Sequence, residues 1–277
     1  MMPEYLKYVF TDSLEFVNTF DELPLWSASF GLLLLKHLEL KPGITMIDIG
    51  CGAGFPLLEL AMRLGDSSTC YGVDPWTNAT QRAKQKIKNY GITNTEILEM
   101  SAEKLPFADA TIDLIVSNLG INNLEQPGKV FAECSRVMKP GARLALTTNL
   151  DGHWQEFYDI FEETLRELGK IEQIPGLVRQ QEHRGSIESI SRLYTGNGME
   201  VSRHFEEQFT MTFVNGSALL NHNFVKLGWL TSWKDLIPET EQEAIFSQLE
   251  RNLNAYATRA GSLTLTVPMA YMEGVKI

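Results

Sequence analysis

The chain has 277 residues, 44% of them hydrophobic and 21% charged, a composition typical of a globular protein with a sizeable apolar core. Asp and Glu (35) outnumber Lys and Arg (24), and the resulting net charge of −11 disfavours nucleic acid as a partner. The apolar run at 30–35 is far shorter than the roughly 20 residues of a membrane span, so we expect no membrane attachment.

The first half of the chain alternates short apolar runs with longer amphipathic segments. The apolar runs predict strands at 44–49, 69–73, 95–98, 112–117 and 141–148. The amphipathic segments predict helices at 55–64, 78–90 and 127–138. This alternation is typical of βαβ units and predicts an α/β fold, in which helices cover both faces of a parallel sheet. A Lys-Pro-Gly triplet at 41–43, and another at 139–141, each predict a helix stop and a turn.

The second half of the chain is richer in predicted helix. Helices are expected at 153–168, 216–228 and 239–257, and strands at 200–213 and 262–277. Pro268 lies inside the last strand and predicts an edge strand or a bulge, because proline lacks the N–H of a sheet ladder. No linker divides the chain, so we expect one domain. It would consist of an N-terminal helical cover (1–40), a ligand-binding core (41–150), and lid insertions with the last two strands (151–277).

A glycine-rich loop, Asp-Ile-Gly-Cys-Gly-Ala-Gly at 48–54, follows the first predicted strand. In an open α/β sheet, ligands bind outside the carboxyl ends of the strands, where this loop would lie. A dinucleotide loop reads G-x-G-x-x-G, but Phe55 stands where its third glycine belongs. The Gly-Lys-Ser/Thr of a phosphate loop is absent. Asp48 would repel a phosphate, and it suits a ligand with a cationic amino group.

Three further motifs follow the loop: YGVDPW (71–76), SAEKLPFADATIDLIVSN (101–118) and RVMKPGARLALT (136–147). Together with the loop, they resemble the class I S-adenosylmethionine-dependent methyltransferases over roughly residues 20–150. The chain resembles in particular the small-molecule enzymes of the ubiquinone and menaquinone biosynthesis type. The resemblance implies a Rossmann-like, mostly parallel seven-stranded sheet with helical lid insertions. It also implies S-adenosylmethionine as the methyl donor and S-adenosylhomocysteine as the product.

The same resemblance implies roles around the donor. Asp48 would hold the amino group of the methionine part, directly or through water. The loop backbone would pass close to that part, through Gly50, Cys51, Gly52 and Gly54. Asp74 would bind the ribose, because one carboxylate has lone pairs for two hydroxyl donors. Asn118, at the end of the fourth strand, would lie beside the methionine part.

The adenine would be bordered by residues from two other motifs. Pro75 or Trp76 would pack against its ring, and Ser101 and Ala102 would meet its edge, Ala102 through its backbone N–H. Glu103 is a further candidate that also fits a solvent-facing position. Trp26 lies in the N-terminal segment, which in the resembling family crosses over the cofactor. Both tryptophans also fit ordinary core packing.

Several donor-site candidates have a structural interpretation as well. Asp48 could cap the following helix, and Asp74 could be a turn acid before Pro75. Ser101 and Glu103 could start a helix. Asn118 could be a turn residue.

Catalysis requires few dedicated side chains in this chemistry. Methyl transfer from a sulfonium is an in-line displacement, and a base is needed only if the acceptor loses a proton as it attacks. Where the family often has a histidine-rich turn, this chain has Ile-Asn-Asn-Leu at 121–124. Asn122 can hydrogen-bond but cannot act as a base. His153 is the other weak candidate, although it also fits a surface histidine at a helix N-terminus.

The three cysteines Cys51, Cys70 and Cys134 have no metal-ligand spacing, and their odd number argues against a disulfide framework. No signal-peptide pattern opens the chain, so we expect a cytoplasmic, metal-free protein. We expect a methyltransferase that acts on a small-molecule acceptor. Two alternatives remain open: a nicotinamide-dependent oxidoreductase on a related fold, and a non-catalytic module that binds the cofactor.

Overall fold

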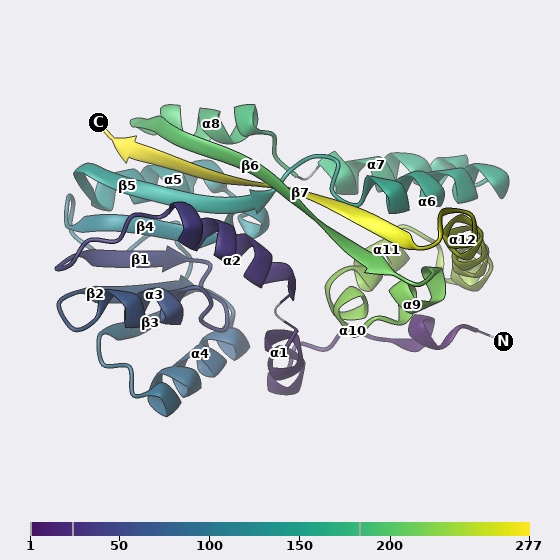
Figure 1. Cartoon of the computed structure of the whole chain (residues 1–277), viewed down its shortest axis with the longest axis horizontal. Coiled ribbons are helices and arrows are strands. Elements are labelled where there is room, and N and C mark those ends of the chain that lie inside the picture. The colour runs from purple at the N-terminus through teal and green to yellow at the C-terminus, as the bar shows by residue number, and fades with distance from the viewer. Residues whose placement is uncertain (1, 24, 183) are drawn as a thin grey trace. The chain divides into compact units, whose positions relative to one another are not determined.

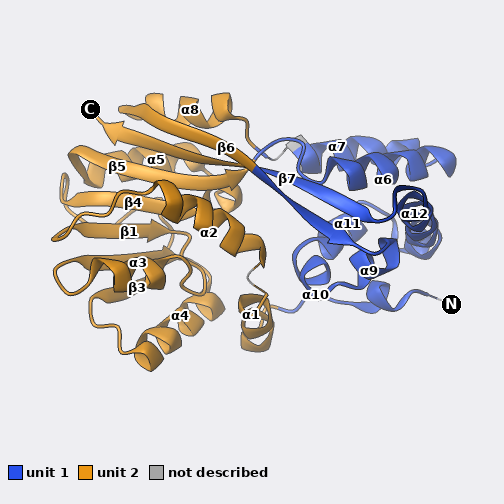
Figure 2. Ribbon diagram, viewed as in Figure 1, with its two compact units in different colours: residues 1–11, 150–184, 208–268 blue, residues 12–149, 185–207, 269–277 orange. Residues whose placement is uncertain are grey.

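The computed structural model describes residues 2–23, 25–182 and 184–277. The chain forms two compact units, which Figure 2 shows in different colours. Unit 1 comprises residues 1–11, 150–184 and 208–268, and unit 2 comprises residues 12–149, 185–207 and 269–277.

The main element of the fold is a seven-stranded sheet with the strand order β3-β2-β1-β4-β5-β7-β6 (Figure 1). Its strands are β1 (Thr45–Ile49), β2 (Thr69–Asp74), β3 (Thr95–Glu99), β4 (Ile112–Asn118), β5 (Met138–Asn149), β6 (Met199–Phe213) and β7 (Leu263–Lys276). The first five strands pair in parallel, and β7 runs antiparallel to β5. The predicted α/β fold with a mostly parallel seven-stranded sheet is therefore confirmed.

The helices of unit 2 cover both faces of this sheet. They are α1 (Leu14–Asp21), α2 (Leu25–His37), α3 (Leu57–Leu64), α4 (Thr77–Tyr90), α5 (Pro127–Val137) and α8 (Ile187–Thr195). In Figure 1, α2 lies on the near face of the sheet and α5 on its far face. Because both faces are covered, β1 is buried from Met46 to Ile49 and reads as a continuous apolar run.

Two local expectations about the strands are wrong. The triplet 139–141 lies inside β5, where the pairing register with β4 shifts, so it marks an irregularity in the strand and not a turn. Pro268 is not in an edge strand, because β7 lies between β5 and β6. The last pair of the β5–β7 ladder is Asn149 with Met269, so Pro268 falls just beyond it, where β5 needs no N–H donor.

Unit 1 is mostly helical. Its elements besides β6 and β7 are η1 (Glu4–Lys7), α6 (Gln155–Glu167), η3 (Ile171–Gln173), α7 (Ile174–Glu182), α9 (Gly216–Asn221), α10 (Asn223–Val225), the π-helix η4 (Lys226–Leu230), α11 (Thr231–Lys234) and α12 (Glu239–Ala260). The single helix expected at 216–228 is divided, because His222 adopts an extended conformation between α9 and α10. In the described part of the chain, every helix is too short or too polar to cross a bilayer.

Candidate functional site

The loop after β1 adopts a conformation that its glycines make possible. Gly50, Gly52 and Gly54 have φ angles of +74°, +49° and +100°, in the left-handed region that disfavours side chains. A Cβ atom on Gly50 would lie only 2.8 Å from the Cα of Gly120, at the start of the short helix η2 (Gly120–Asn123). The loop backbone therefore packs directly against the chain that follows β4.

Asp48, the penultimate residue of β1, is completely buried. Neither of its carboxyl oxygens makes a hydrogen bond with any part of the chain that the structure describes. Burial raises the pKa of this carboxyl well above its ordinary value. The charge of Asp74 adds to the rise, and the Leu57 backbone N–H partly opposes it. The N-cap position of α3 is taken by Pro56 without a side-chain bond, so the helix-cap interpretation of Asp48 is wrong.

A buried carboxylate without a partner is costly, because it has lost its hydration and gained nothing in return. Such a group is favourable only when a ligand supplies a cation or several N–H donors. Asp48 adjoins the glycine loop, where a ligand can approach the backbone closely. The pair of features therefore fits a ligand that carries an ammonium group.

Asp74, the last residue of β2, is tied to the same loop. Its Oδ2 accepts a hydrogen bond from the Gly52 N–H at 2.8 Å, and its Oδ1 accepts one from the Trp76 N–H at 2.8 Å. The second bond is the side-chain turn that the turn interpretation expects, but the first is a long-range contact. Burial raises the pKa of Asp74, and the two backbone bonds partly oppose that rise. Two accepted bonds leave acceptor capacity on the carboxylate.

The side chain of Trp76 is held from the N-terminal segment. It is half-buried, and its Nε1 donates to Asp12 Oδ1 at 2.8 Å. Its ring centroid lies 6.0 Å from that of Phe16 on α1. Pro75 beside it is exposed. Trp76 is therefore not an ordinary core residue, and sequence reasoning missed Asp12 because no local pattern links the two positions.

The segment after β3 forms turns and not a helix, so the helix-start interpretation of Ser101 and Glu103 is wrong. Ser101 is exposed, and its Oγ accepts the Glu103 backbone N–H at 3.2 Å. Glu103 is half-buried, and Ala102 between them is buried. Ala102 thus keeps its expected location under the turn.

Asn118 ends β4 and is fully engaged with other parts of unit 2. Its Nδ2 donates to the Ser27 carbonyl of α2 at 3.1 Å, and its Oδ1 accepts from the Thr147 Oγ1 at 2.7 Å. The turn interpretation is wrong, because the residue is the last of the strand. Trp26 is buried on α2, with its ring centroid 5.1 Å from that of Phe30.

Of the two catalytic candidates, Asn122 lies in η2 and belongs to a polar network at the end of β5. Its Nδ2 donates to Asn149 Oδ1 at 2.6 Å, and its Oδ1 accepts from the Thr148 hydroxyl. Cys51, in the glycine loop, is buried, and burial raises the pKa of its thiol well above the ordinary value, so it is a poor nucleophile.

His153, in unit 1, is 2% exposed, so the surface interpretation is wrong. Its ring stacks on that of Trp154, with 4.9 Å between centroids. Burial lowers the pKa of this imidazole well below the ordinary value, and the Arg184 charge lowers it further. A neutral imidazole with so low a pKa is a weak base. Across the described residues, no group of three His, Cys, Asp or Glu side chains could hold a metal ion.

Comparison with known proteins decides the class of this domain. Residues 47–146 match the family model described as "Methyltransferase domain". A solved S-adenosylmethionine-dependent methyltransferase from Aquifex aeolicus is 25% identical and superposes with a TM-score of 0.53, covering 68% of this chain and 90% of that one. Residues 47–146 belong to a class I methyltransferase domain. S-adenosylmethionine is the cofactor of this class.

The curated relatives of the methyltransferase domain agree with this assignment. The chain is 30% identical over 141 residues to a demethylmenaquinone methyltransferase of Geobacillus sp. (strain WCH70), covering 50% of this chain and 60% of the relative. It is 26% identical over 171 residues to the enzyme of that name from Oceanobacillus iheyensis, covering 60% of this chain and 69% of the relative. The chain thus spans about 60% of the length of the first of these relatives.

The geometry of the methyltransferase domain fits this cofactor. The partnerless Asp48 carboxylate matches an ammonium group, and a loop without Cβ atoms admits the amino-acid part of a ligand. Asp74, with acceptor capacity left, is at the end of the neighbouring strand.

Proposed function

We propose that this protein transfers a methyl group from S-adenosylmethionine to a small-molecule acceptor by in-line displacement. The observation that carries the proposal is the buried Asp48 carboxylate, which has no hydrogen-bond partner and adjoins the glycine loop. A dinucleotide or a nucleotide phosphate would be repelled there, whereas the ammonium of the donor would be bound.

The proposed donor contacts follow from the position of each side chain. Asp48 accepts hydrogen bonds from the ammonium group, and Gly50 and Gly52 let the loop backbone approach the amino-acid part. Asp74 accepts from the ribose hydroxyls while the Gly52 and Trp76 N–H groups keep it oriented. Trp76 and the Ala102 turn border the adenine, and the exposed Pro75, Ser101 and Glu103 contribute less.

The chemistry asks little of the protein beyond orientation. The donor supplies a methyl group on a sulfonium, which is already activated for attack by a nucleophile in line with the C–S bond. The chain positions the two reactants and excludes water. Beyond the ends of β4 and β5, the side chains of Asn122, Thr148 and Asn149 are neutral, so we propose that they orient the acceptor without taking its proton.

A small acceptor is the proposal that best fits the observations. The net charge of −11 opposes a nucleic-acid substrate. The relatives named demethylmenaquinone methyltransferases bear the name of a small-molecule substrate, and we extend that substrate class, but not the compound, to this chain. A cytoplasmic location, a single-domain organisation and a metal-free reaction stay predictions. The comparisons favour neither an oxidoreductase nor a non-catalytic module.

A metabolite screen that follows release of S-adenosylhomocysteine tests this proposal. We expect turnover with a small, partly apolar acceptor, and thermal stabilisation by S-adenosylhomocysteine but not by NADH. Stabilisation by NADH alone would favour the oxidoreductase. Donor binding without turnover on any small molecule, together with methylation of a protein or RNA, would contradict the acceptor class.

A further inference from the structure

Helix α2 (Leu25–His37) differs from the other helices of unit 2 because it carries apolar side chains on all sides. Resting on the proposed function, we propose that α2 covers the methionine end of the donor site. We further propose that Asn118, Gly31 and Glu273 are positioning residues, which hold this cover in place without touching the donor. Three separate contacts carry the inference.

The first contact joins α2 to the end of β4. The Nδ2 of Asn118 donates to the Ser27 carbonyl, one turn into α2, at 3.1 Å. The Thr147 hydroxyl bonds to the Oδ1 of Asn118 at 2.7 Å and thereby fixes which way the amide points. Because Asn118 is buried and both ends of its amide are used, it serves α2 and not a ligand.

The second contact joins α2 to the donor loop. A Cβ atom on Gly31 would lie 2.2 Å from Cε1 and 2.3 Å from Cζ of Phe55, which directly follows the last glycine of the loop. Glycine in a helix costs about 1 kcal/mol relative to alanine, so its presence here needs a compensating contact. The absence of a side chain lets the Phe55 ring lie flush against the helix and brings the helix and loop together.

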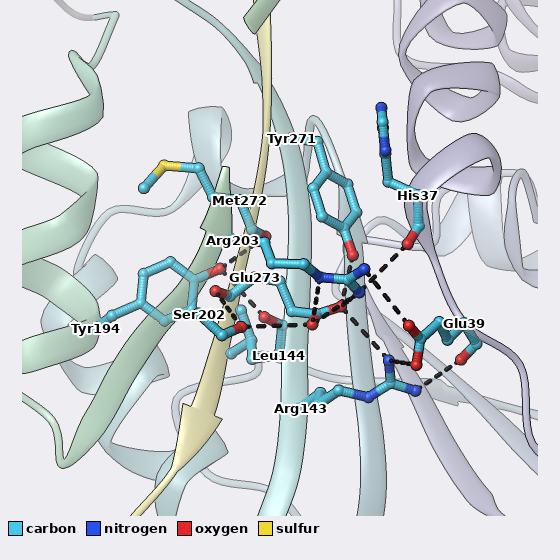
Figure 3. A network of polar contacts seen from close by, with 10 residues as sticks. All are labelled: His37, Glu39, Arg143, Leu144, Tyr194, Ser202, Arg203, Tyr271, Met272 and Glu273. Atoms are coloured by element: carbon cyan, nitrogen blue, oxygen red, sulfur yellow. Dashed lines mark hydrogen bonds and ion pairs between the residues drawn. The ribbon is translucent and has the colours of Figure 1, made fainter. Parts of the chain in front are cut away.

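The third contact holds the carboxyl-terminal end of α2, as Figure 3 shows. Arg203 Nη2 donates to the His37 carbonyl at 3.4 Å, and Arg143 Nη2 donates to the Glu39 carbonyl at 2.6 Å. Both guanidiniums are anchored on Glu273, which is 2% exposed. Arg203 Nη2 contacts both oxygens of Glu273 at 2.9 Å, and Arg143 Nη1 lies 3.6 Å from Oε2.

Glu273 is further fixed from the neighbouring strands. The Tyr271 hydroxyl donates to its Oε2 at 2.6 Å, and Ser202 Oγ lies 3.4 Å from its Oε1. Removing one member of a buried charge network leaves the others uncompensated, which displaces the groups that they hold. Glu273 pairs with Ala145, inside β5 and several residues before its carboxyl end, so it would affect donor binding through α2.

The test combines two measurements on the whole chain. Calorimetry measures the Kd of S-adenosylhomocysteine, and hydrogen exchange with mass spectrometry measures how well the α2 amides are protected in the ligand-free protein. We expect Asn118→Ala and Gly31→Ala each to raise the Kd by about tenfold, the value of one lost hydrogen bond, and to speed exchange in residues 25–37. Glu273→Gln should act in the same direction, and Arg203→Lys is the milder substitute if that variant does not fold.

Asn94→Ala is the matched control. Its half-buried Nδ2 also donates to backbone carbonyls, those of Ala61 and Gly65, but at the opposite end of α3 from the loop. We expect it to leave both the Kd and α2 exchange unchanged. A higher Kd in Asn118→Ala with unchanged α2 exchange would make Asn118 a donor ligand and overturn the inference. No binding of S-adenosylhomocysteine by the wild-type chain would instead remove the proposed function itself.

Discussion

Two pairs of polar side chains stand beside the glycine loop, and they differ in how far their hydrogen-bonding capacity is used. Asp48 and Asp74, from β1 and β2, are buried acids with capacity left over, and Asp48 has no partner at all. Asn118 and Asn122, from the end of β4 and the turn after it, are amides bonded through both oxygen and nitrogen.

The contrast separates groups that await a ligand from groups that hold the protein. A buried polar group without a partner destabilises the fold, so its presence needs another reason, and binding is the natural one. A satisfied amide already contributes to the fold. By this criterion the donor is bound from the β1–β2 side, whereas the β4–β5 side fixes α2 and η2.

Replacing Asp48 should produce the largest effect. Asp48→Asn removes the charge that holds the donor ammonium, and we expect the Kd of S-adenosylhomocysteine to rise by about 100-fold or more. The same variant should raise the Tm of the ligand-free protein by about 2–4 °C, as about 1 kcal/mol of relieved burial cost would in a chain of this size. Calorimetry and thermal melts measure the two effects, and a lowered Tm would mean that Asp48 has a structural partner.

Replacing Asp74 should have the next largest effect. Asp74→Ala removes the ribose acceptor and also frees the Gly52 and Trp76 N–H groups, so we expect a Kd about 10–100-fold higher. Asp66→Ala, at an exposed acid in the turn before β2, is the control and should change nothing. Unchanged affinity of Asp74→Ala by calorimetry would show that the ribose assignment is wrong.

The two acids should also make donor binding pH-dependent. Burial raises the pKa of both carboxyls, and donor binding requires the ionised forms, so the Kd should rise by up to about tenfold per unit as pH falls below the pKa of Asp48. In Asp48→Asn this dependence should largely vanish. An identical pH dependence in both proteins would assign it to another group.

The raised pKa of Asp48 has the opposite consequence for stability. Its folded-state pKa lies above the unfolded value of about 4, so the folded chain binds this proton more tightly. This stabilisation of the ligand-free protein is fully present below the unfolded pKa and is lost as pH rises through the folded pKa. Asp48→Asn should flatten that part of the stability profile, measured by urea unfolding across the pH range.

Changes on the amide side should be the smallest. Asn122→Ala removes bonds to Thr148 and Asn149, and we expect a decrease in kcat of about tenfold or less and little change in donor Kd. The pH–rate profile should keep its shape, since an amide does not titrate. A lost pH limb in this variant would give the turn an acid–base role and erase the contrast between the two sides.

The sequence predicted the parallel sheet and the acids at its edge because both depend on local patterns. The apolar runs mark buried strands, and the loop spacing with Asp48 excludes two of three ligand classes. The partners of the site residues could not be predicted, because Asn118 pairs with Ser27 and Trp76 with Asp12 across long stretches of chain. The burial of His153 and the division of 216–228 by a π-helix likewise depend on tertiary packing in unit 1.

The central claim is that Asp48 binds the amino-acid end of the donor. The most direct test compares the Kd of S-adenosylhomocysteine with that of 5′-methylthioadenosine, which lacks the amino-acid part, in wild-type and Asp48→Asn proteins. We predict that the substitution weakens S-adenosylhomocysteine by about 100-fold but changes the Kd of 5′-methylthioadenosine by less than about threefold. Equal losses for both ligands would contradict the account.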